Sequence, residues 1–292
     1  MALRHTIDFI LNHPLNKNQK GQAIWRFLKW QVKSRVSSKS SVANYGEKSK
    51  IIVKKGLTGA TGNLYSGLHE FEDMSFLLHL LRDTDMFIDV GANVGSYTIL
   101  GSNERGAETI SIEPIPQTFE ILQQNVRLNE VTSLVTCKNI GMGNENGILK
   151  FTKSLDTVNH VAKDYDTDTV NVKVERFDEF ITLHKPTLIK IDVEGFETEV
   201  LNGMKIALAD EHLKAIIIEL NGSGGRYGFD ENLIHEKFLG LGFVPFAYEP
   251  YERKLTKLEK QGPDNTIYIK DLEFVSNRLK SAEPYTIRGQ KI

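Results

Sequence analysis

Five short, almost continuously apolar runs constrain the fold of this chain more than any other feature. Each is rich in β-branched residues, as strands buried on both faces of a parallel sheet are. They cover residues 86–90, 109–113, 134–140, 187–193 and 215–220. Helical patterns lie between and after them, at residues 96–103, 117–129, 197–208 and 230–239. The alternation predicts an α/β fold with a mostly parallel, doubly wound sheet.

Two regions depart from this alternation. Residues 147–180 contain two strand-like runs around a polar middle. An insertion of this kind beside the strand ends is suited to be a lid over the acceptor molecule on which such a protein would act. Two further strand-like runs, FVPFAYE and TIYIK, predict an antiparallel pair at one edge of the sheet. We therefore expect a main domain over residues 51–280 and a tail over residues 281–292.

The first 50 residues form a separate, basic element. They hold ten Lys and Arg against two acidic residues, a net charge of +8, whereas the rest of the chain carries −10. Residues 20–36 predict an amphipathic helix with interleaved basic residues, followed by a flexible connection over residues 34–42. The helix is suited either to docking on the acidic main domain or to peripheral contact with an acidic membrane. Docking is the simpler interpretation.

The composition of the chain excludes several classes of protein. No apolar run reaches the length of about 18 residues that a membrane span needs, and the N-terminus lacks the core of a signal peptide, so we expect a cytoplasmic protein. Cys137 is the only cysteine, which excludes internal disulfides and zinc sites built on paired cysteines. The acidic main domain argues against nucleic acid as a partner.

The glycine-containing segment FIDVGANVGSYT indicates a ligand site. A buried strand runs into Gly91, Gly95 opens the next helix, and unpaired N–H groups are expected at that helix N-terminus. The spacing is not the G-x-G-x-x-G of dinucleotide sites. Asp89 is placed to meet a cation such as the amino group of S-adenosylmethionine. Glu113, at the end of the second strand, can accept hydrogen bonds from both ribose hydroxyls.

A second segment, LIKIDVEGFETEVLNGM, places charges inside an apolar strand. Lys190, Asp192 and Glu194 share one face of an extended strand, and the two carboxylates reach the rim where doubly wound folds bind ligands. Charges in such a strand are costly unless they are paired. Lys190 either neutralises Asp192 in a structural ion pair or takes part in function, and both interpretations stay open.

With these motifs the sequence resembles the FkbM family of methyltransferases. The resemblance rests on FIDVGANVGSYT, IEPIPQTFEILQQNVRLN and, most specifically, LIKIDVEGFETEVLNG, and it extends over residues 67–270. It implies a Rossmann-like class I methyltransferase fold, S-adenosyl-L-methionine as cofactor, and O-methylation of a sugar, glycan or natural product. By position, it assigns cofactor binding to seven residues: Asp89, Gly91, Ala92, Asn93, Gly95, Glu113 and Asp192.

Removing the proton of an acceptor hydroxyl calls for a general base. Asp192 is the first candidate because it ends a central strand, and His160 in the insertion is the second because imidazole titrates near neutral pH. Glu219, at the end of the strand at residues 215–220, binds the acceptor, serves as an alternative base or caps the following turn, and these interpretations stay open. Together with Glu194 these side chains offer ligands for a hard cation, but their spacing does not demand one, and we expect no required metal.

Two rival functions remain. A nicotinamide-dependent oxidoreductase would also use a glycine turn and Glu113, although the spacing of the glycines argues against it. A catalytically inactive cofactor-binding protein would keep the fold without turnover. The sequence leaves the identity of the acceptor and the oligomeric state open.

Overall fold

The computed structural model describes residues 2–37, 39–181 and 184–292. An eight-stranded sheet forms its centre, with the strand order β12-β11-β13-β10-β9-β3-β4-β5. These strands are β3 (Met86–Val90), β4 (Glu108–Ile112), β5 (Val135–Lys138), β9 (Leu188–Ile191), β10 (Ala215–Glu219), β11 (Val244–Glu249), β12 (Lys254–Lys257) and β13 (Asn265–Ile269). The five apolar runs form β3, β4, β5, β9 and β10, which pair in parallel. The predicted α/β fold is therefore confirmed.

The C-terminal strands add the antiparallel part of the sheet. β13 lies between β10 and β11 and is antiparallel to both, so the TIYIK run lies inside the sheet and not at its edge. The edge strand is β12, which pairs antiparallel with β11. β12 comes from the polar stretch that the sequence left unassigned, because an edge strand needs little apolar surface.

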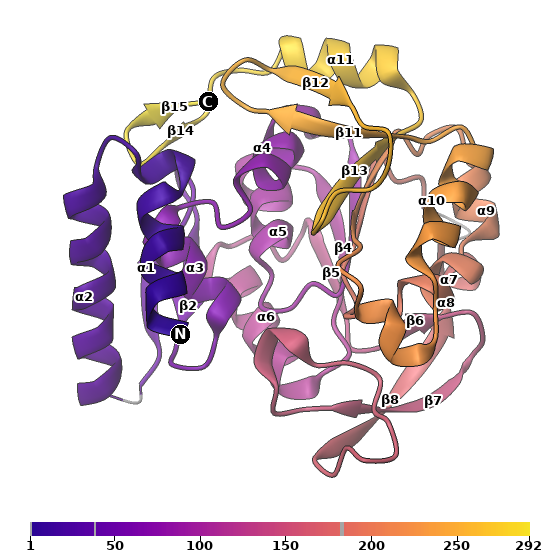
Figure 1. The fold of residues 1–292 in the computed structure, drawn as a ribbon, viewed down its shortest axis with the longest axis horizontal. Helices are drawn as coiled ribbons and strands as arrows, with labels where there is room; N and C mark the ends of the chain where they lie inside the picture. The colour runs from indigo at the N-terminus through magenta and orange to yellow at the C-terminus, as the bar shows by residue number, and fades with distance from the viewer. Residues whose placement is uncertain (1, 38, 182–183) are drawn as a thin grey trace.

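Helices cover both faces of the sheet (Figure 1). One layer holds α4 (Phe71–Leu80), α5 (Ser96–Ile99) with a π-helical continuation at Leu100–Glu104, and α6 (Pro116–Leu128). The other holds α7 (Phe177–Ile181), α8 (Glu197–Asn202), α9 (Lys205–Ala209) and α10 (Glu231–Gly240), while α11 (Leu272–Lys280) packs on α4. Neighbouring residues of one strand serve opposite layers, as Phe87 and Ile88 belong to two different core clusters.

The helix expected over residues 197–208 is interrupted at Gly203, between α8 and α9. A Cβ at Gly203 would collide with the backbone carbonyl of Gly143, in β6 (Gly141–Gly143). The N–H of Asp178 also donates to the carbonyl of Gly203, at 2.9 Å. The close approach of β6 and α7 therefore ends α8, which no local pattern in the sequence reveals.

The insertion forms a small sheet with the preceding residues 141–143, below the ends of the central strands (Figure 1). β6 lies parallel to β8 (Thr169–Arg176), and β8 pairs antiparallel with β7 (Gly147–Thr152). A 3-10 turn at Asp156–Val158 lies between β7 and β8. Phe151, Val172 and Val174 form a separate apolar cluster with Ile115, which anchors this sheet to the main domain.

The N-terminal region docks on the main domain through two helices. In Figure 1, α2 (Lys20–Val36) is the outermost element, beside α1 (Ala2–Asn12) and α3 (Thr58–Ser66). Ala23, Phe27 and Trp30 of α2 are buried in the same cluster as the residues of α4. No helix of the described residues is long and apolar enough to cross a membrane.

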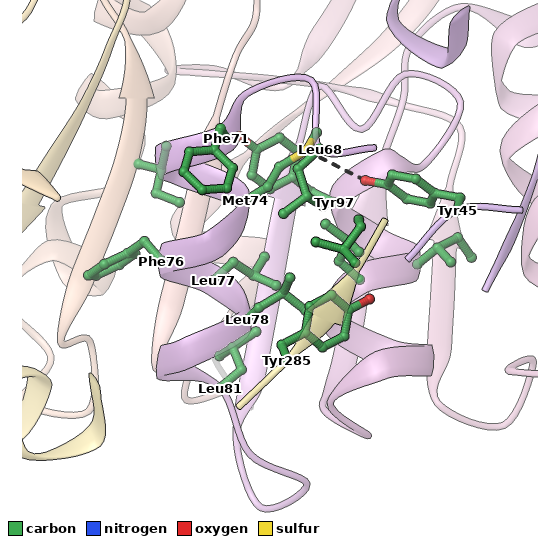
Figure 2. Close-up of a cluster of buried hydrophobic side chains, with 14 of the residues drawn as sticks. Tyr45, Leu68, Phe71, Met74, Phe76, Leu77, Leu78, Leu81, Tyr97 and Tyr285 are labelled. Atoms are coloured by element: carbon green, nitrogen blue, oxygen red, sulfur yellow. Dashed lines mark hydrogen bonds between the residues drawn. The ribbon is translucent and has the colours of Figure 1, made fainter. Parts of the chain in front are cut away.

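A hairpin and the chain's last residues join this region to the core. β1 (Ser41–Asn44) pairs with β2 (Lys50–Val53), so the boundary expected at residue 50 falls within one hairpin, and the connection before it is shorter than residues 34–42. The short strands β14 (Thr286–Ile287) and β15 (Gln290–Lys291) follow α11. Figure 2 shows Tyr285, from the tail, beside Leu78 of α4, and Tyr45 donating to the sulfur of Met74.

Candidate functional site

A cavity of about 800 Å³ opens where the parallel strands end. Its floor is formed by the residues after β3, β4, β9 and β10, at the switch point between β3 and β9 where the strand order reverses. One wall comes from α1, α2 and α3, and another from Phe151 and residues 157–159 of the insertion. The hydroxyls of Thr58 and Thr157 lie 3.1 Å apart and join the two walls.

The glycine segment after β3 satisfies its own backbone donors. The N–H groups of Gly91 and Ala92 both donate to the carbonyl of Ile112 at 2.9 Å, and that of Asn93 donates to Glu113 at 3.0 Å. The next two N–H groups, of Val94 and Gly95, also donate within the segment. The N–H groups of residues 91–95, which precede the helix N-terminus, are therefore all paired within the protein. A phosphate bound by backbone N–H groups needs unpaired donors.

The two glycines are required by packing inside the protein. Gly91 has a φ of +79°, and a Cβ there would collide with the carbonyl oxygen of Asp192. Gly95 has a φ of +90°, and its Cβ would press into the side chain of Leu122. The close backbone approach at Gly91 thus brings the end of β9 against the end of β3, which places Asp192 beside the glycine segment.

Asp89 is buried at the end of β3 and lines the cavity. Its Oδ2 accepts hydrogen bonds from the backbone N–H and the hydroxyl of Thr98, at 3.0 and 2.7 Å. Its Oδ1 is buried and has no hydrogen-bond partner among the described residues. Burial raises the pKa of Asp89 to about 6, against the opposing effect of Lys190. A buried carboxylate oxygen without a partner is costly, and it suits a ligand with a cationic donor.

Glu113 follows β4 on the adjacent side of the cavity. Its two oxygens accept the N–H groups of Asn93 and Ile115, at 3.0 and 2.8 Å, which fix the carboxylate in position. Burial raises the pKa of Glu113 to about 7. Each carboxylate oxygen retains a second lone pair, so the group can still accept hydrogen bonds from a bound ligand.

Buried Lys190 and partly buried Asp192 form an ion pair in the lining of the cavity. The Nζ of Lys190 donates to Oδ2 of Asp192 at 2.7 Å and lies 4.7 Å from the centroid of the Tyr97 ring. Burial favours the neutral amine, but Asp192, Glu70 and Asp89 outweigh it and raise the pKa of Lys190. Lys190 is therefore the cation that keeps a group of neighbouring carboxylates in the folded core.

Asp192 also belongs to a cluster of three carboxylates, with Glu194 and Glu219. Oxygen atoms of Asp192, Glu194 and Glu219 lie within 4.8 Å of one another, an arrangement able to hold a proton or a cation. Burial, followed by the charge of Asp192, raises the pKa of Glu194 to about 7. The same two causes raise the pKa of Glu219 to about 9. At neutral pH Glu219 is therefore protonated, and Glu194 is close to the midpoint of its titration.

Two other glutamates perform the capping at this end of the sheet. Glu197 is buried and accepts the N–H groups of Val193 and Gly195, at 3.1 and 3.2 Å. The turn after β10 is capped by Glu231, which accepts the N–H groups of Gly222 and Gly224, both at 2.9 Å. Glu219 is therefore not the cap of that turn, and its Oε2 is buried without a partner among the described residues.

His160 is not brought together with the other candidates. Its ring is buried in the insertion, where Nδ1 lies 2.8 Å from the carbonyl of Val158 and Nε2 lies 3.6 Å from Asp166. It does not contribute to the lining of the cavity. The β7–β8 connection folds the imidazole inward, so its position in a polar segment gave a misleading signal.

The sequence also missed the lining that comes from the N-terminal region. Phe9 of α1, Phe27 of α2 and Asn63 of α3 face the cavity, as does His69 in the loop before α4. Only long-range packing brings them there, although the apolar periodicity of residues 7–11 was a signal for α1. All of the predicted cofactor and catalytic residues line the cavity except His160 and Gly95.

This sheet, with its ligand cavity at the switch point and an antiparallel strand near one end, is the class I, Rossmann-like methyltransferase fold. A model of the methyltransferase FkbM domain matches residues 89–255, more than half of the chain. The chain therefore belongs to the FkbM family of methyltransferases, as the sequence motifs predicted, and it is an enzyme of the methyltransferase class.

Two relatives that match this chain by sequence are named methyltransferases. Methyltransferase 1 of Beauveria bassiana is 30% identical over 217 residues, which cover 64% of this chain and 85% of the relative. Hexuronic acid methyltransferase AglP of Haloferax volcanii is 29% identical over 155 residues, covering 52% and 62%. Among solved structures, precorrin-6y C5,15-methyltransferase of Geobacter metallireducens shares 14% identity and a TM-score of 0.41, covering 70% of this chain and 89% of that one.

Proposed function

We propose that the protein transfers a methyl group from S-adenosylmethionine to a hydroxyl of a sugar, glycan or natural product. The observation that carries the proposal is the division of one cavity into two halves. Asp89 and Glu113 offer fixed acceptors on one side, and the cluster of Asp192, Glu194 and Glu219 offers proton-accepting groups on the other. A relative named for hexuronic acid methylation supports the sugar class of acceptor alone, because a uronic acid carries a carboxylate and the acceptor proposed below is neutral.

The residues present fit S-adenosylmethionine better than a dinucleotide. Asp89 retains an unpartnered buried oxygen for an ammonium group, and Glu113 retains lone pairs for ribose hydroxyls. The N–H groups of residues 91–95 are used internally, so they do not offer the cradle that a pyrophosphate requires. The alternative of a nicotinamide-dependent oxidoreductase is disfavoured on this ground. When bound, S-adenosylmethionine supplies an electrophilic methyl group on a sulfonium.

Within the acceptor half, we assign the general base to Glu194. A base works best when its pKa lies near the working pH, and Glu194 has a pKa of about 7. Asp192, the first choice from the sequence, has one oxygen held by the buried Lys190, which weakens it as a base. Glu219 is protonated at neutral pH and can donate a hydrogen bond to the acceptor or to its neighbours.

The charge of the lining also indicates the kind of acceptor. Carboxylates dominate the acceptor half. The cation Lys190 is already paired with Asp192, and Arg226 acts on Glu194 but does not line the cavity. Sugar hydroxyls donate hydrogen bonds to carboxylates, whereas an anionic acceptor would be repelled. We therefore propose a neutral polyhydroxylated acceptor. Transfer of a labelled methyl group to neutral glycosides, with little transfer to the matching uronides, is the expected result, and the reverse preference would contradict it.

A matched pair of variants tests the base. Glu194→Gln removes the proton acceptor and should lower turnover at least about a hundredfold. Glu219→Gln mimics the protonated state and should leave turnover within a few-fold of wild type. Turnover should also rise with pH through about 7, because Glu194 must be deprotonated to act. If Glu219→Gln were the inactive variant and Glu194→Gln the active one, the assignment would be wrong.

Cofactor binding is tested separately from turnover. Glu113→Gln should weaken binding of S-adenosylhomocysteine in calorimetry at least about tenfold through the loss of charge-assisted hydrogen bonds, while the exposed Glu120→Gln should not. S-adenosylhomocysteine, but not NAD, should raise the melting temperature. Stabilisation by NAD alone would support the oxidoreductase. Saturable S-adenosylhomocysteine binding without transfer to any acceptor would support a catalytically inactive protein.

A further inference from the structure

The outer face of α2 has no role in the site. Trp25, Val32 and Val36 are exposed to 66, 65 and 82%, and Leu28 is half-exposed. At about 100° per residue these four side chains fall within an arc of about 80°. The residues that dock α2, Ala23, Phe27 and Trp30, lie on the opposite side. The helix thus has two apolar faces, of which only one is covered by the protein.

Basic residues border the uncovered face. Lys29 and Lys33 flank it on one side and Arg35 on the other, and all three are exposed. α2 contains no acidic residue along its 17 positions. Scattered exposed apolar residues are ordinary on protein surfaces, but a continuous stripe rimmed by one sign of charge marks an interaction site.

We propose that this face of α2 lies on an anionic lipid bilayer surface. A helix with a stripe of Trp, Leu and Val between Lys and Arg residues is suited to the interface, where the apolar groups enter the acyl boundary and the basic groups meet lipid phosphates. A second copy of the chain fits less well, because a symmetric contact would place Lys29, Lys33 and Arg35 opposite the same residues of its partner.

The position of α2 in the cavity wall relates the proposed membrane contact to the site. The inner side of α2 contributes Phe27 and Gln31 to the cavity wall, and α1 beside it contributes Leu3 and Phe9. Membrane contact would therefore hold the cavity next to the bilayer surface, within reach of an acceptor carried on a lipid. The inference stands apart from the proposed function, because vesicle binding requires no methyl transfer.

Flotation with vesicles tests the inference directly. The full chain should float with phosphatidylcholine vesicles that contain phosphatidylglycerol, and at least tenfold less with phosphatidylcholine alone. Emission of Trp25, isolated by Trp30→Phe, should shift to the blue with the anionic vesicles. A triple variant, Trp25→Ser with Val32→Ser and Val36→Ser, should lose at least tenfold in binding, as should Lys29→Gln with Lys33→Gln.

The control is Ile148→Ser, which removes an apolar side chain exposed to 72% on β7, far from α2 in the fold, and should bind as wild type does. Unchanged circular dichroism and melting temperature show that each variant is folded. Equal binding by wild type and the triple variant would overturn the inference. A dimer in light scattering that the triple variant abolishes, without vesicle binding by wild type, would also overturn it and assign the face to a second copy.

Discussion

Replacing Lys190 by methionine tests whether this cation holds the carboxylates of the site in the folded core. Methionine keeps most of the stem volume but removes the charge that pairs with Asp192 at 2.7 Å. Lys190 is 3% exposed, and breaking a buried ion pair by removing one partner costs about 3–5 kcal/mol. Because the side chain of Asp192 retains 25% of its exposure, we expect the lower end, about 3 kcal/mol at pH 8.

The loss of unfolding free energy in Lys190→Met should be larger at high pH than at low pH. Without Lys190, which opposes the effect of burial, the pKa of Asp89 rises further above its value in the unfolded chain. A carboxyl group with a raised folded-state pKa loses stabilisation as pH rises through that pKa. The difference in unfolding free energy between wild type and variant should therefore be smaller at pH 5.5 than at pH 8, by at least about 1 kcal/mol.

Urea unfolding followed by circular dichroism at both pH values measures this difference. Lys214→Met is the matched control, because Lys214 pairs with Asp271 at 2.9 Å on the surface, where such pairs contribute about 0–1 kcal/mol. A loss below about 1 kcal/mol for Lys190→Met at pH 8, or one equal at both pH values, would refute the reasoning.

Three further outcomes follow from the same geometry. Gly91→Ala should unfold at lower temperature and bind S-adenosylhomocysteine poorly, because its Cβ would collide with the carbonyl of Asp192; a wild-type melting curve would contradict this. Wild-type unfolding free energy should fall between pH 5 and pH 8, since burial raises the pKa of Asp89 to about 6 and of Glu113 to about 7; a urea titration showing a rise would be inconsistent. Turnover should survive thorough chelation, whereas total loss that Mg²⁺ restores would assign a cation to the cluster around Glu219.

Local patterns predicted the centre of this fold well. The run at residues 86–90 forms β3 with the same bounds. The run at 109–113 is displaced from β4 by one residue at each end, and the run at 215–220 is one residue longer than β10. Such strands are buried on both faces, so their composition alone identifies them. The interrupted helix at Gly203 and the inward-facing His160 were missed or misread, since both depend on segments that fold against them from elsewhere in the chain.

The sequence by itself determined the class of fold, the family and the carboxylates that end the central strands, because strand burial and strand ends are local properties. Only the tertiary structure decided what those groups do to one another. It pairs Lys190 with Asp192, leaves an oxygen of Asp89 without a partner, and raises the pKa of Glu194 and of Glu219. Burial and charge separation are properties of three-dimensional neighbours, so the working state of each carboxylate is set by the assembled fold.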